Sequence, residues 1–425
     1  MQGKVRIIKV NRIAYKYPEI VEIIKKKGFD VWRDFKHHDI PRSAAGFVKA
    51  DVEGLVMTTV HTLGGAKMME YVAKVAEGSD LEVLAVTILT SHDQASLNRE
   101  LGIPGTIKQS VVRLALMAER AGLGIVCSAK EATILRKILK PTTLIVTPGI
   151  KPLWAVEEKD QARVTTPYQA IMNGSDYIVV GSAIYKSENP AVAADKIVAE
   201  IKKALLDRKK KALIIQDETE MFMSQEDIRK IFSEAKAVIL DDHFVYKSTK
   251  HGSAYVNKDR IFFDPVTISS LGFEIACRFI NDEVDVVIGP VVGGAILSQW
   301  TAYHLSALLG KKVFAVFADK DGDDFIIKRG YDKFLPNSNV LVVEDIVTTG
   351  GSAIKVIKQV LSCGGKIAGL GILCNRGNVS FDVPKFLSLL TIDLKAWDEK
   401  ECPLCAKGVP VNVELGKGKQ FLARQ

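Results

Sequence analysis

The sequence predicts an α/β protein with two domains. The chain has 425 residues, more than one average domain, and its 47% hydrophobic and 25% charged residues are ordinary for a globular protein with full cores. Short apolar runs of strand length alternate with helical patterns through both halves, which is typical of parallel sheets covered by helices. The pattern changes between residues 207 and 223, so we place the domain boundary there.

Seven strand–helix units in the first half predict a (β/α) barrel. The expected strands are Val5–Val10, Asp30–Phe35, Gly54–Val60, Leu81–Leu89, Gly124–Ser128, Thr142–Val146 and Tyr177–Gly181. The last helix begins at Asn189-Pro190, a capping residue followed by proline at the first helical position, and ends in the basic run 207–211. The predicted domains are therefore 1–207 and 224–425, joined by a linker at 208–223.

The second half begins with a predicted helix and then alternates strands and helices. Ser224 precedes Gln225-Glu226-Asp227, whose acids suit the first turn of a helix. Farther along, Val340–Val343 is an apolar run that reads as a buried parallel strand, and a helical pattern follows from Ala353 to Leu361. A parallel sheet is therefore expected here too.

Lysines and aspartates alternate on the first two expected strands. Asp34 and Lys36 share one face of their strand, and in the upper half of a barrel strand that face is the interior mouth. Lys9 has the matching place on the preceding strand, whereas Asp39 lies beyond its strand and could return to this site or reach a neighbouring subunit. Each acid would hold a lysine protonated, at about 1 to 4 kcal/mol per close pair. On spacing alone, a catalytic array and a structural salt-bridge network are both open.

Segment 340–352 has the composition of a ribose-phosphate site. Glu344 and Asp345 follow the apolar run and offer acceptors for vicinal ribose hydroxyls. The loop after them contains Thr348, Thr349, Gly350, Gly351 and Ser352. Its backbone N–H groups and hydroxyls can hold a phosphate at the start of the next helix. The segment resembles the phosphoribosyl-pyrophosphate (PRPP) motif of type I phosphoribosyltransferases, which implies their α/β fold with a parallel sheet.

The first half contains a series of further short motifs. In order, they are Asp34-x-Lys36-x-x-Asp39-Ile40, Thr59-Val60-His61, Thr87-Ile88-Leu89-Thr90-Ser91, Val126-Cys127-Ser128, Thr147-Pro148-Gly149-Ile150 and Asp160-Gln161-x-Arg163-x-x-Thr166-Pro167. In this order they resemble orotidine 5′-phosphate decarboxylase across nearly the whole first half. The resemblance implies a TIM barrel and an enzyme that uses neither a metal nor an organic cofactor.

The resemblance also implies roles for individual residues. Lys36 would deliver a proton to C6 of the pyrimidine as CO2 leaves, and Lys9, Asp34 and Asp39 would complete an array whose preorganised charge supplies the catalysis. Substrate-binding roles are implied for Ser43, Ser91, Pro148, Gln161 and Gly181. Of these, Gln161 would lie near the phosphate and Ser91 would contact the base. Asp39 and Ser43 would enter the site of the other subunit, which implies a homodimer.

Two features differ from the decarboxylase family. That family begins with a further strand, which carries a ribose-binding aspartate, so we expect a TIM barrel that lacks its first strand and has an open edge. The family also ends its last strand with Gly-Arg, whose arginine grips the phosphate, whereas this sequence has Gly181-Ser182. Losing that contact would cost about 1.5 to 3 kcal/mol of binding. We therefore expect a weakened or inactive decarboxylase unless the neighbouring Lys186 substitutes for the arginine.

Three more segments extend the transferase resemblance. They are Asp285–Pro290 with Gly293-Gly294, Phe317–Lys320 with Ile327–Tyr331, and Tyr246-Lys247-Ser248 with His251–Tyr255. They resemble the pyrophosphate-contacting strand, the mobile cationic hairpin and the N-terminal substrate-binding segment of orotate phosphoribosyltransferase.

Release of pyrophosphate requires Mg2+ and cationic side chains, because several negative charges develop on the leaving group. We expect Lys320 to be catalytic, and Lys247, Lys328 and Arg329 to bind substrate. The Mg2+ would be carried by PRPP, with no dedicated protein ligands.

Cys402-Pro403-Leu404-Cys405 offers only two of the four ligands of a structural zinc site. No second His or Cys pair follows it, so we expect a structural turn. His37, His38 and His61 are likewise explained by hydrogen bonding or exposure at the barrel mouth.

Composition excludes several classes of protein. The longest apolar run, Val286–Leu297, is too short to span a bilayer, and the N-terminus has no apolar region of the signal-peptide kind. Six cysteines are too few for a secreted disulfide scaffold, so a cytoplasmic protein is expected. The net charge of +8 forms no basic stripe with interleaved aromatic residues, which favours small anionic substrates over nucleic acid.

Together, the two resemblances imply a fused enzyme of de novo UMP biosynthesis whose substrates are orotate, PRPP and orotidine 5′-phosphate. Two alternatives remain open from the sequence. The barrel could be an inactive scaffold for an active transferase, or the chain could be a PRPP-sensing binding protein. The cationic hairpin argues against a sensor, because a sensor need not stabilise a leaving pyrophosphate.

Overall fold

The computed structural model describes residues 6–424 except 12, 156–163, 215–222, 240–241, 247–248, 378 and 393–395. Two of the predicted site residues, Gln161 and Lys247, lie outside the described residues. The chain forms two compact units, Met1–Met221 and Phe222–Gln425. Among the helices that the structure describes, none has both the length and the apolar character of a membrane span.

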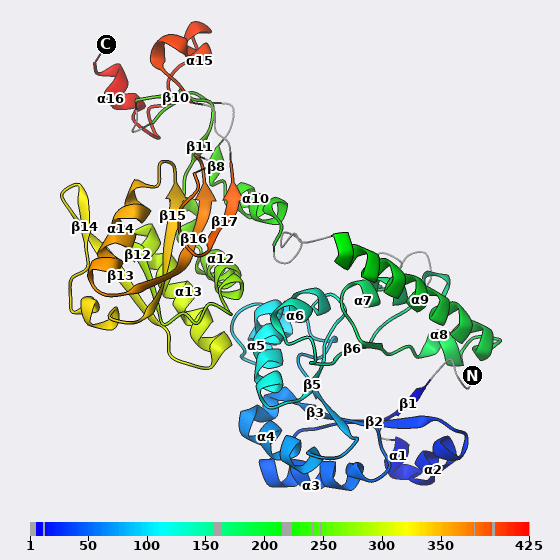
Figure 1. Ribbon diagram of the computed structural model, residues 1–425. Coiled ribbons are helices and arrows are strands. Elements are labelled where there is room, and N and C mark those ends of the chain that lie inside the picture. Colours follow the sequence, from blue (N-terminus) through cyan, green and yellow to red (C-terminus); the bar gives the residue numbers. More distant parts are fainter. Residues whose placement is uncertain are drawn as a thin grey trace. The chain divides into compact units, whose positions relative to one another are not determined.

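The first unit is built on seven parallel strands that lie in sequence order in one curved sheet (Figure 1). The strands are β1 (Ile7–Val10), β2 (Asp30–His37), β3 (Met57–His61), β4 (Glu82–Val86), β5 (Gly124–Val126), β6 (Ile145–Thr147) and β7 (Tyr177–Ile178). Within the described residues, β1 pairs only with β2 and β7 only with β6. The sheet is therefore open, and the predicted seven-strand barrel with an open edge is confirmed.

Helices connect these strands. They are α1 (Ile13–Lys16), α2 (Glu19–Lys26), α3 (Pro41–Val52), α4 (Gly65–Ala76), α5 (Ile107–Arg120), α6 (Ala132–Ile138), α7 (Pro167–Met172), α8 (Ser182–Tyr185) and α9 (Pro190–Ile214). The sequence placed the end of the last helix in the basic run 207–211 and a linker at 208–223, but α9 continues to Ile214. Lysine and arginine are good helix formers, so the basic run extends the helix instead of ending it.

Apolar side chains fill the interior of the curved sheet. The buried cluster consists of Trp32, Met57, Leu84, Val86, Val126 and Val146. Trp32 lies two residues before Asp34, and Met57 lies two residues before Thr59, so each pair shares one face of its strand. The apolar core thereby places these polar side chains one step nearer the carboxyl ends of the strands, the usual place for a site in this fold.

The second unit has a six-stranded main sheet in the order β14-β13-β12-β15-β16-β17. Its strands are β12 (Val286–Pro290), β13 (Phe314–Asp321), β14 (Asp324–Ile326), β15 (Asn339–Val347), β16 (Lys366–Asn375) and β17 (Phe386–Thr391). All pairs are parallel except β13–β14, which forms an antiparallel hairpin. The predicted parallel sheet and the predicted hairpin are both confirmed.

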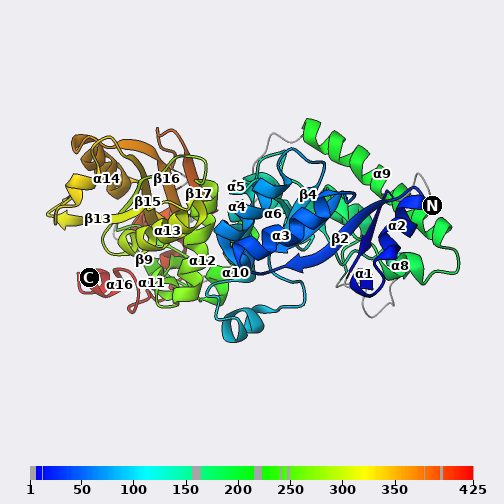
Figure 2. The same cartoon turned by 90° about the horizontal axis from the view of Figure 1, so that it is seen from below.

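Helices cover both faces of this sheet. They are α10 (Gln225–Glu234), α11 (Asp259–Phe262), α12 (Pro265–Arg278), α13 (Gly293–Leu309) and α14 (Gly351–Ser362). Figure 2 shows α14 on one side of the strands and α12 with α13 on the other. The predicted helix after Ser224 is present, and the Ser224 hydroxyl caps it by accepting from the Asp227 amide.

Two small sheets and two short helices complete the second unit. Strands β9 (Phe244–Val245), β10 (His251–Gly252) and β18 (Ala396–Trp397) form one small sheet, and β8 (Val238–Ile239) with β11 (Tyr255–Val256) forms the other. The chain ends in α15 (Pro403–Ala406) and α16 (Gly418–Leu422), which Figure 1 shows beside β10.

Candidate active sites

The predicted array of lysines and aspartate is assembled at the mouth of the first unit. The Asp34 carboxylate accepts hydrogen bonds from Lys36 Nζ at 2.8 and 2.9 Å and from Lys9 Nζ at 2.6 Å. The Thr59 hydroxyl on β3 donates to Asp34 Oδ1 at 3.0 Å and accepts from the Lys36 amide at 2.9 Å. The side chain of Asp34 is only 6% exposed, against 31% for Lys9 and 37% for Lys36. A buried carboxylate thus holds two ammonium groups that reach the opening.

This carboxylate is ionised at neutral pH. Burial alone would raise the pKa of Asp34, but the hydrogen bonds and charges of Lys36 and Lys9 outweigh it and set the pKa below the usual value. The array therefore carries two positive charges around one negative charge. Such an arrangement favours an anionic ligand in the space beside it.

The backbone at Lys36 explains how its side chain meets Asp34. Lys36 has φ 51°, in the left-handed region that residues with a Cβ seldom occupy. The pairing of β2 with β3 shifts between Arg33 and His37, as in a bulge that re-aims a side chain. A non-glycine residue held there costs of order 1 to 3 kcal/mol, a strain that is commonest at functional sites. The sequence did not predict this bulge.

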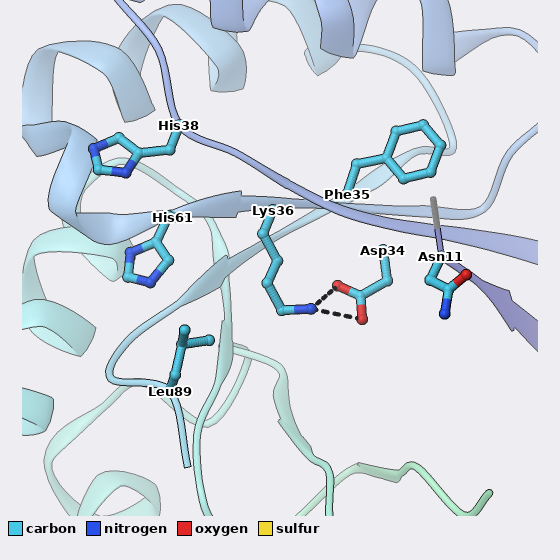
Figure 3. A pocket seen from close by; sticks show the side chains of 7 residues that line it. All are labelled: Asn11, Asp34, Phe35, Lys36, His38, His61 and Leu89. Atoms are coloured by element: carbon cyan, nitrogen blue, oxygen red, sulfur yellow. Dashed lines mark hydrogen bonds and ion pairs between the residues drawn. The ribbon is translucent and has the colours of Figure 1, made fainter. Parts of the chain in front are cut away.

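A cavity of about 460 Å³ lies beside the array, within the size range of small-molecule sites (Figure 3). It is lined by Asn11, Asp34, Phe35, Lys36, His38, His61 and Leu89. Asn11 was not among the predicted residues. Its place directly after the strand that carries Lys9 is the signal that could have identified it.

His61 lines this cavity as a neutral side chain. Burial lowers the pKa of His61 to about 4, and the charges of His38 and Lys36 act in the same direction. Its Nδ1 accepts a hydrogen bond from the Leu63 amide at 3.3 Å, and its ring stacks on that of His38 with centroids 5.6 Å apart. Hydrogen bonding at the mouth accounts for His61, as the sequence predicted.

This lowered pKa predicts a pH dependence of stability. Between pH 6.5 and about 4 the unfolded chain binds a proton at His61 that the folded chain does not bind, so the stabilisation is complete above pH 6.5 and is lost as the pH falls. We expect the change His61→Gln to reduce the loss of unfolding free energy between pH 7 and pH 5 by about 1 to 2 kcal/mol, since the open cavity screens part of the effect. Urea unfolding curves at both pH values measure this difference. Identical pH dependence in the two proteins would contradict it.

The other predicted residues of the first unit that the structure describes follow strands at the same end of the sheet and are not among the residues that line the cavity. Asp39 is exposed, and its carboxylate accepts from the Ile40 amide at 2.7 Å. Ser43 is half-buried on α3, Ser91 is exposed after β4, Pro148 is half-buried after β6, and Gly181 is exposed before α8. Their roles in binding, and the entry of Asp39 and Ser43 into a second subunit, stay predictions.

In the second unit, the predicted acid pair lies at the carboxyl end of β15. Glu344 is 5% exposed and Asp345 is 4% exposed. Lys258, which the sequence analysis missed, donates to Asp345 Oδ2 at 2.5 Å. Burial acts against the charge of Lys258, but the Asp345 carboxylate outweighs it and raises the pKa of Lys258. Asp345 and Lys258 therefore form an ion pair at neutral pH.

Glu344 differs from its neighbour. Burial, followed by the charge of Asp345, raises the pKa of Glu344 well above its usual value. Among the described residues, its Oε2 has no hydrogen-bond partner although it is buried. Such a polar atom is rare in folded proteins, and this oxygen is free to accept a hydrogen bond from a ligand.

The hydroxyl-rich loop connects β15 to α14 as predicted. Thr348, Thr349, Gly351 and Ser352 are exposed, so their polar groups can reach a ligand. Gly350 has φ 80°, and a Cβ at this position would lie 2.8 Å from the Phe381 ring, so both backbone and space require glycine. The start of α14, a helix of 12 residues, lies directly after it and favours an anion.

The cationic residues gather on the hairpin at the edge of this sheet. Lys320 is exposed near the end of β13. Arg329 donates to both oxygens of Asp319 at 3.1 and 3.3 Å, and Lys328 lies 3.7 Å from Asp321. Two of the three predicted cations are therefore paired with acids of the hairpin itself.

Two protein families match this chain, one in each unit. The orotidine 5′-phosphate decarboxylase / HUMPS family matches residues 1–197. The enzyme named orotidine 5′-phosphate decarboxylase from Halorhodospira halophila is 44% identical over 189 residues, which cover 43% of this chain and 79% of that protein. The chain belongs to this family. The protein of the same name from Teredinibacter turnerae is 46% identical over 188 residues, covering 43% of this chain and 80% of that protein.

The phosphoribosyl transferase domain family matches residues 272–401, a range that includes the acid pair, the loop and the hairpin. We therefore refer to a decarboxylase unit and a transferase unit. Among solved structures, the UMP synthase of Leishmania donovani aligns with 98% of this chain and 89% of its own, at 16% identity and a TM-score of 0.47. The orotidine 5′-phosphate decarboxylase of Lactobacillus acidophilus aligns with 45% of this chain and 85% of its own, at 31% identity and a TM-score of 0.41.

Proposed function

We propose that this chain catalyses two consecutive reactions of de novo UMP biosynthesis. The transferase unit joins orotate to PRPP and releases pyrophosphate, and the decarboxylase unit converts the resulting orotidine 5′-phosphate to UMP. The observation that carries the proposal is the presence on one chain of two charge arrangements, the Lys9–Asp34–Lys36 array and the acid pair beside the hydroxyl-rich loop.

In the decarboxylase unit, the bond between C6 of the pyrimidine and its carboxylate breaks, CO2 leaves, and the electron pair stays on C6. Lys36 is the proton donor to C6, because its ammonium group is fixed by Asp34 and points into the cavity. The negative charge of the buried Asp34 repels the carboxylate of the substrate, which favours the loss of CO2. Lys9 keeps Asp34 in place once Lys36 has given up its proton.

In the transferase unit, the bond from ribose C1 to pyrophosphate breaks as the orotate nitrogen bonds to C1. Glu344 and Asp345 accept hydrogen bonds from the ribose hydroxyls, and the loop 348–352 holds the 5′-phosphate. Mg2+ would enter with PRPP as part of the substrate, and the Glu344 oxygen that has no partner among the described residues is available to a ribose hydroxyl. Lys320, Lys328 and Arg329 stabilise the charge that develops on pyrophosphate.

Two further parts of the proposal concern assembly and location. In a homodimer, the exposed Asp39 and the half-buried Ser43 would complete the cavity of the second subunit. The substrates orotate, PRPP and orotidine 5′-phosphate are small anions, which suits a chain of net charge +8. We propose that the enzyme works in the cytoplasm.

The proposal is tested with the purified full chain in two separate assays. Loss of orotate absorbance with PRPP and Mg2+ reports the transferase, and CO2 release from added orotidine 5′-phosphate reports the decarboxylase. PRPP binding without turnover would favour the sensor, and transferase activity without CO2 release would favour the scaffold. Activity in both assays is the expected result.

Ser182 provides a specific prediction for the decarboxylase unit. Lys186 directly follows α8, and its amide donates to the Ser182 carbonyl at 3.1 Å, so the two residues are one helical turn apart and Lys186 can contribute to phosphate binding in place of the family's arginine. We expect Ser182→Arg to lower KM for orotidine 5′-phosphate by roughly 10- to 100-fold, the equivalent of about 1.5 to 3 kcal/mol. Steady-state kinetics of the variant and of Lys186→Ala measure this. An unchanged KM in Ser182→Arg would show that the phosphate is not bound at this position.

A further inference from the structure

Four side chains with metal-binding atoms meet in the transferase unit, outside the site described above. They are His243, His251, Cys402 and Cys405, and one ligand atom from each lies within 4.8 Å of all the others. The first three are buried and Cys405 is half-buried. His243 directly precedes β9, and His251 is the first residue of β10. The cysteines come some 150 residues later, with Cys402 directly before α15 and Cys405 within it.

The distances between these atoms suit tetrahedral zinc. Bonds of about 2.0 to 2.1 Å to nitrogen and 2.3 Å to sulfur place neighbouring ligand atoms ~3.3 Å (N to N) and ~3.6 Å (N to S) apart. In the structure, His243 Nε2 lies 3.6 Å from Cys402 Sγ and 3.7 Å from Cys405 Sγ, and His251 Nδ1 lies 3.3 Å from Cys405 Sγ. The two ring nitrogens are 2.8 Å apart. The two imidazoles would therefore move slightly apart when the ion binds.

The hydrogen bonding around the cluster orients one ligand in the way metal sites require. His243 Nδ1 donates to the Val409 carbonyl at 2.7 Å, since a carbonyl can only accept. Its Nε2 therefore presents a lone pair to the cluster, the arrangement that fixes metal-binding histidines in proteins. Within the described residues, the buried Nε2 of His251 has no hydrogen-bond partner. Without a cation, the two imidazoles and the two thiols contact one another, and a bound Zn2+ would replace these contacts with bonds to the metal.

The cluster lies where two segments far apart in the sequence meet, and backbone hydrogen bonds from the Asn412 amide to His243 and from the Lys417 amide to Val245 also join them. Strands β9, β10 and β18 have only two residues each, too few for a stable sheet on their own. The first two belong to the beginning of the transferase unit and the third to its end. A cation bound by all four side chains would fasten the carboxyl-terminal segment to the strands that lead into the transferase fold. Many small metal-binding domains fold only when their metal is bound.

We propose that His243, His251, Cys402 and Cys405 bind one structural Zn2+ in a closed four-coordinate site. Four protein ligands leave no open position for substrate, so the ion stabilises the transferase unit without entering its chemistry. The proposal is independent of the reactions assigned to the two units.

Metal content and cobalt spectroscopy of the full chain test the site. We expect about one zinc per chain by elemental analysis after purification without chelators. Removal of the ion and titration with Co2+ should give the visible absorption of tetrahedral cobalt together with thiolate charge-transfer bands, complete at one equivalent. Cys405→Ser should lose the zinc and lower the melting temperature. Cys363→Ser, which replaces a free cysteine at the end of α14, should keep the zinc and serves as the matched control.

Two results would overturn the proposal. One is wild-type protein, folded by circular dichroism, that contains no zinc and gives only the spectrum of octahedral Co2+. The other is a Cys402–Cys405 disulfide in protein purified under reducing conditions. Because both measurements use the wild-type chain, they remain decisive even if Cys405→Ser does not fold.

Discussion

Replacing Lys36 by alanine is expected to lower kcat for decarboxylation by roughly 10²- to 10⁴-fold, the contribution typical of a positioned proton donor. The ammonium group of Lys36 is held by both oxygens of Asp34 and lines the cavity, so its loss removes the proton source and leaves Asp34 with Lys9 as its cationic partner. Initial rates of CO2 release from orotidine 5′-phosphate measure the effect. The transferase rate of the same protein should be unchanged, which makes the second activity an internal control for folding of the chain.

A glycine variant separates the amine from the backbone at this position. Because Lys36 has φ 51°, alanine there keeps the strain, whereas glycine removes it and should make Lys36→Gly about 1 to 2 kcal/mol more stable than Lys36→Ala. If the missing amine causes the loss of activity, both variants are equally inactive. Recovery of decarboxylation in Lys36→Gly would show that the backbone conformation, and not proton donation, accounts for the effect.

Sequence patterns predicted most of the architecture because the strands of both units are buried and their apolar runs are distinct. The expected runs around Asp30, Gly124 and Val340 all became strands, and the motif after Val340 became a strand, loop and helix in the expected order. The end of α9 was misplaced, because a basic run is compatible with both a helix interior and a helix end. Local propensity alone did not decide between them.

Alternation along strands placed Asp34 and Lys36 on one face and Lys9 beside them, and the structure brings these three together. The alternation pattern could not predict the bulge at Lys36, because the left-handed backbone there depends on the pairing with β3 and on Thr59. Lys258 was missed for a different reason. It lies 87 residues before Asp345, and only the tertiary fold brings the two side chains together.

The interpretation of Cys402 and Cys405 shows the same limit. The sequence predicted a structural turn at this pair because no second His or Cys pair follows it, and residues that precede the pair were not considered. His243 and His251 precede the pair by about 150 residues, and the pairing of β10 with β18 brings the two segments together. A histidine pair with seven residues between its members has no recognised metal spacing, so no local pattern could have identified it.

The transferase unit should depend on Asp345 for its reaction, although by a smaller factor than the decarboxylase unit depends on Lys36. Asp345→Asn is expected to lower kcat/KM for PRPP by roughly 10- to 100-fold, because a charge-assisted hydrogen bond to the ribose contributes about 1.5 to 3 kcal/mol. The same change leaves Lys258 without the carboxylate that holds it at 2.5 Å. Loss of orotate absorbance at varied PRPP concentrations measures the effect, and the decarboxylase rate is the control. An unchanged kcat/KM would place the ribose elsewhere.

Gly293→Ala tests the position of the same carboxylate without removing a polar group. A Cβ on Gly293 would lie 1.7 Å from Asp345 Oδ2 and 3.0 Å from the Phe262 ring, so the carboxylate must move away from its present place. We expect a loss of transferase kcat/KM comparable to that of Asp345→Asn. Gly46→Ala on α3 is the matched control, since a Cβ there meets nothing within 4 Å and alanine favours a helix. Gly293→Ala could instead keep full transferase activity while Asp345→Asn loses it. That result would show that the reaction needs the charge of Asp345 but not its present position, because substrate binding would then reposition the carboxylate.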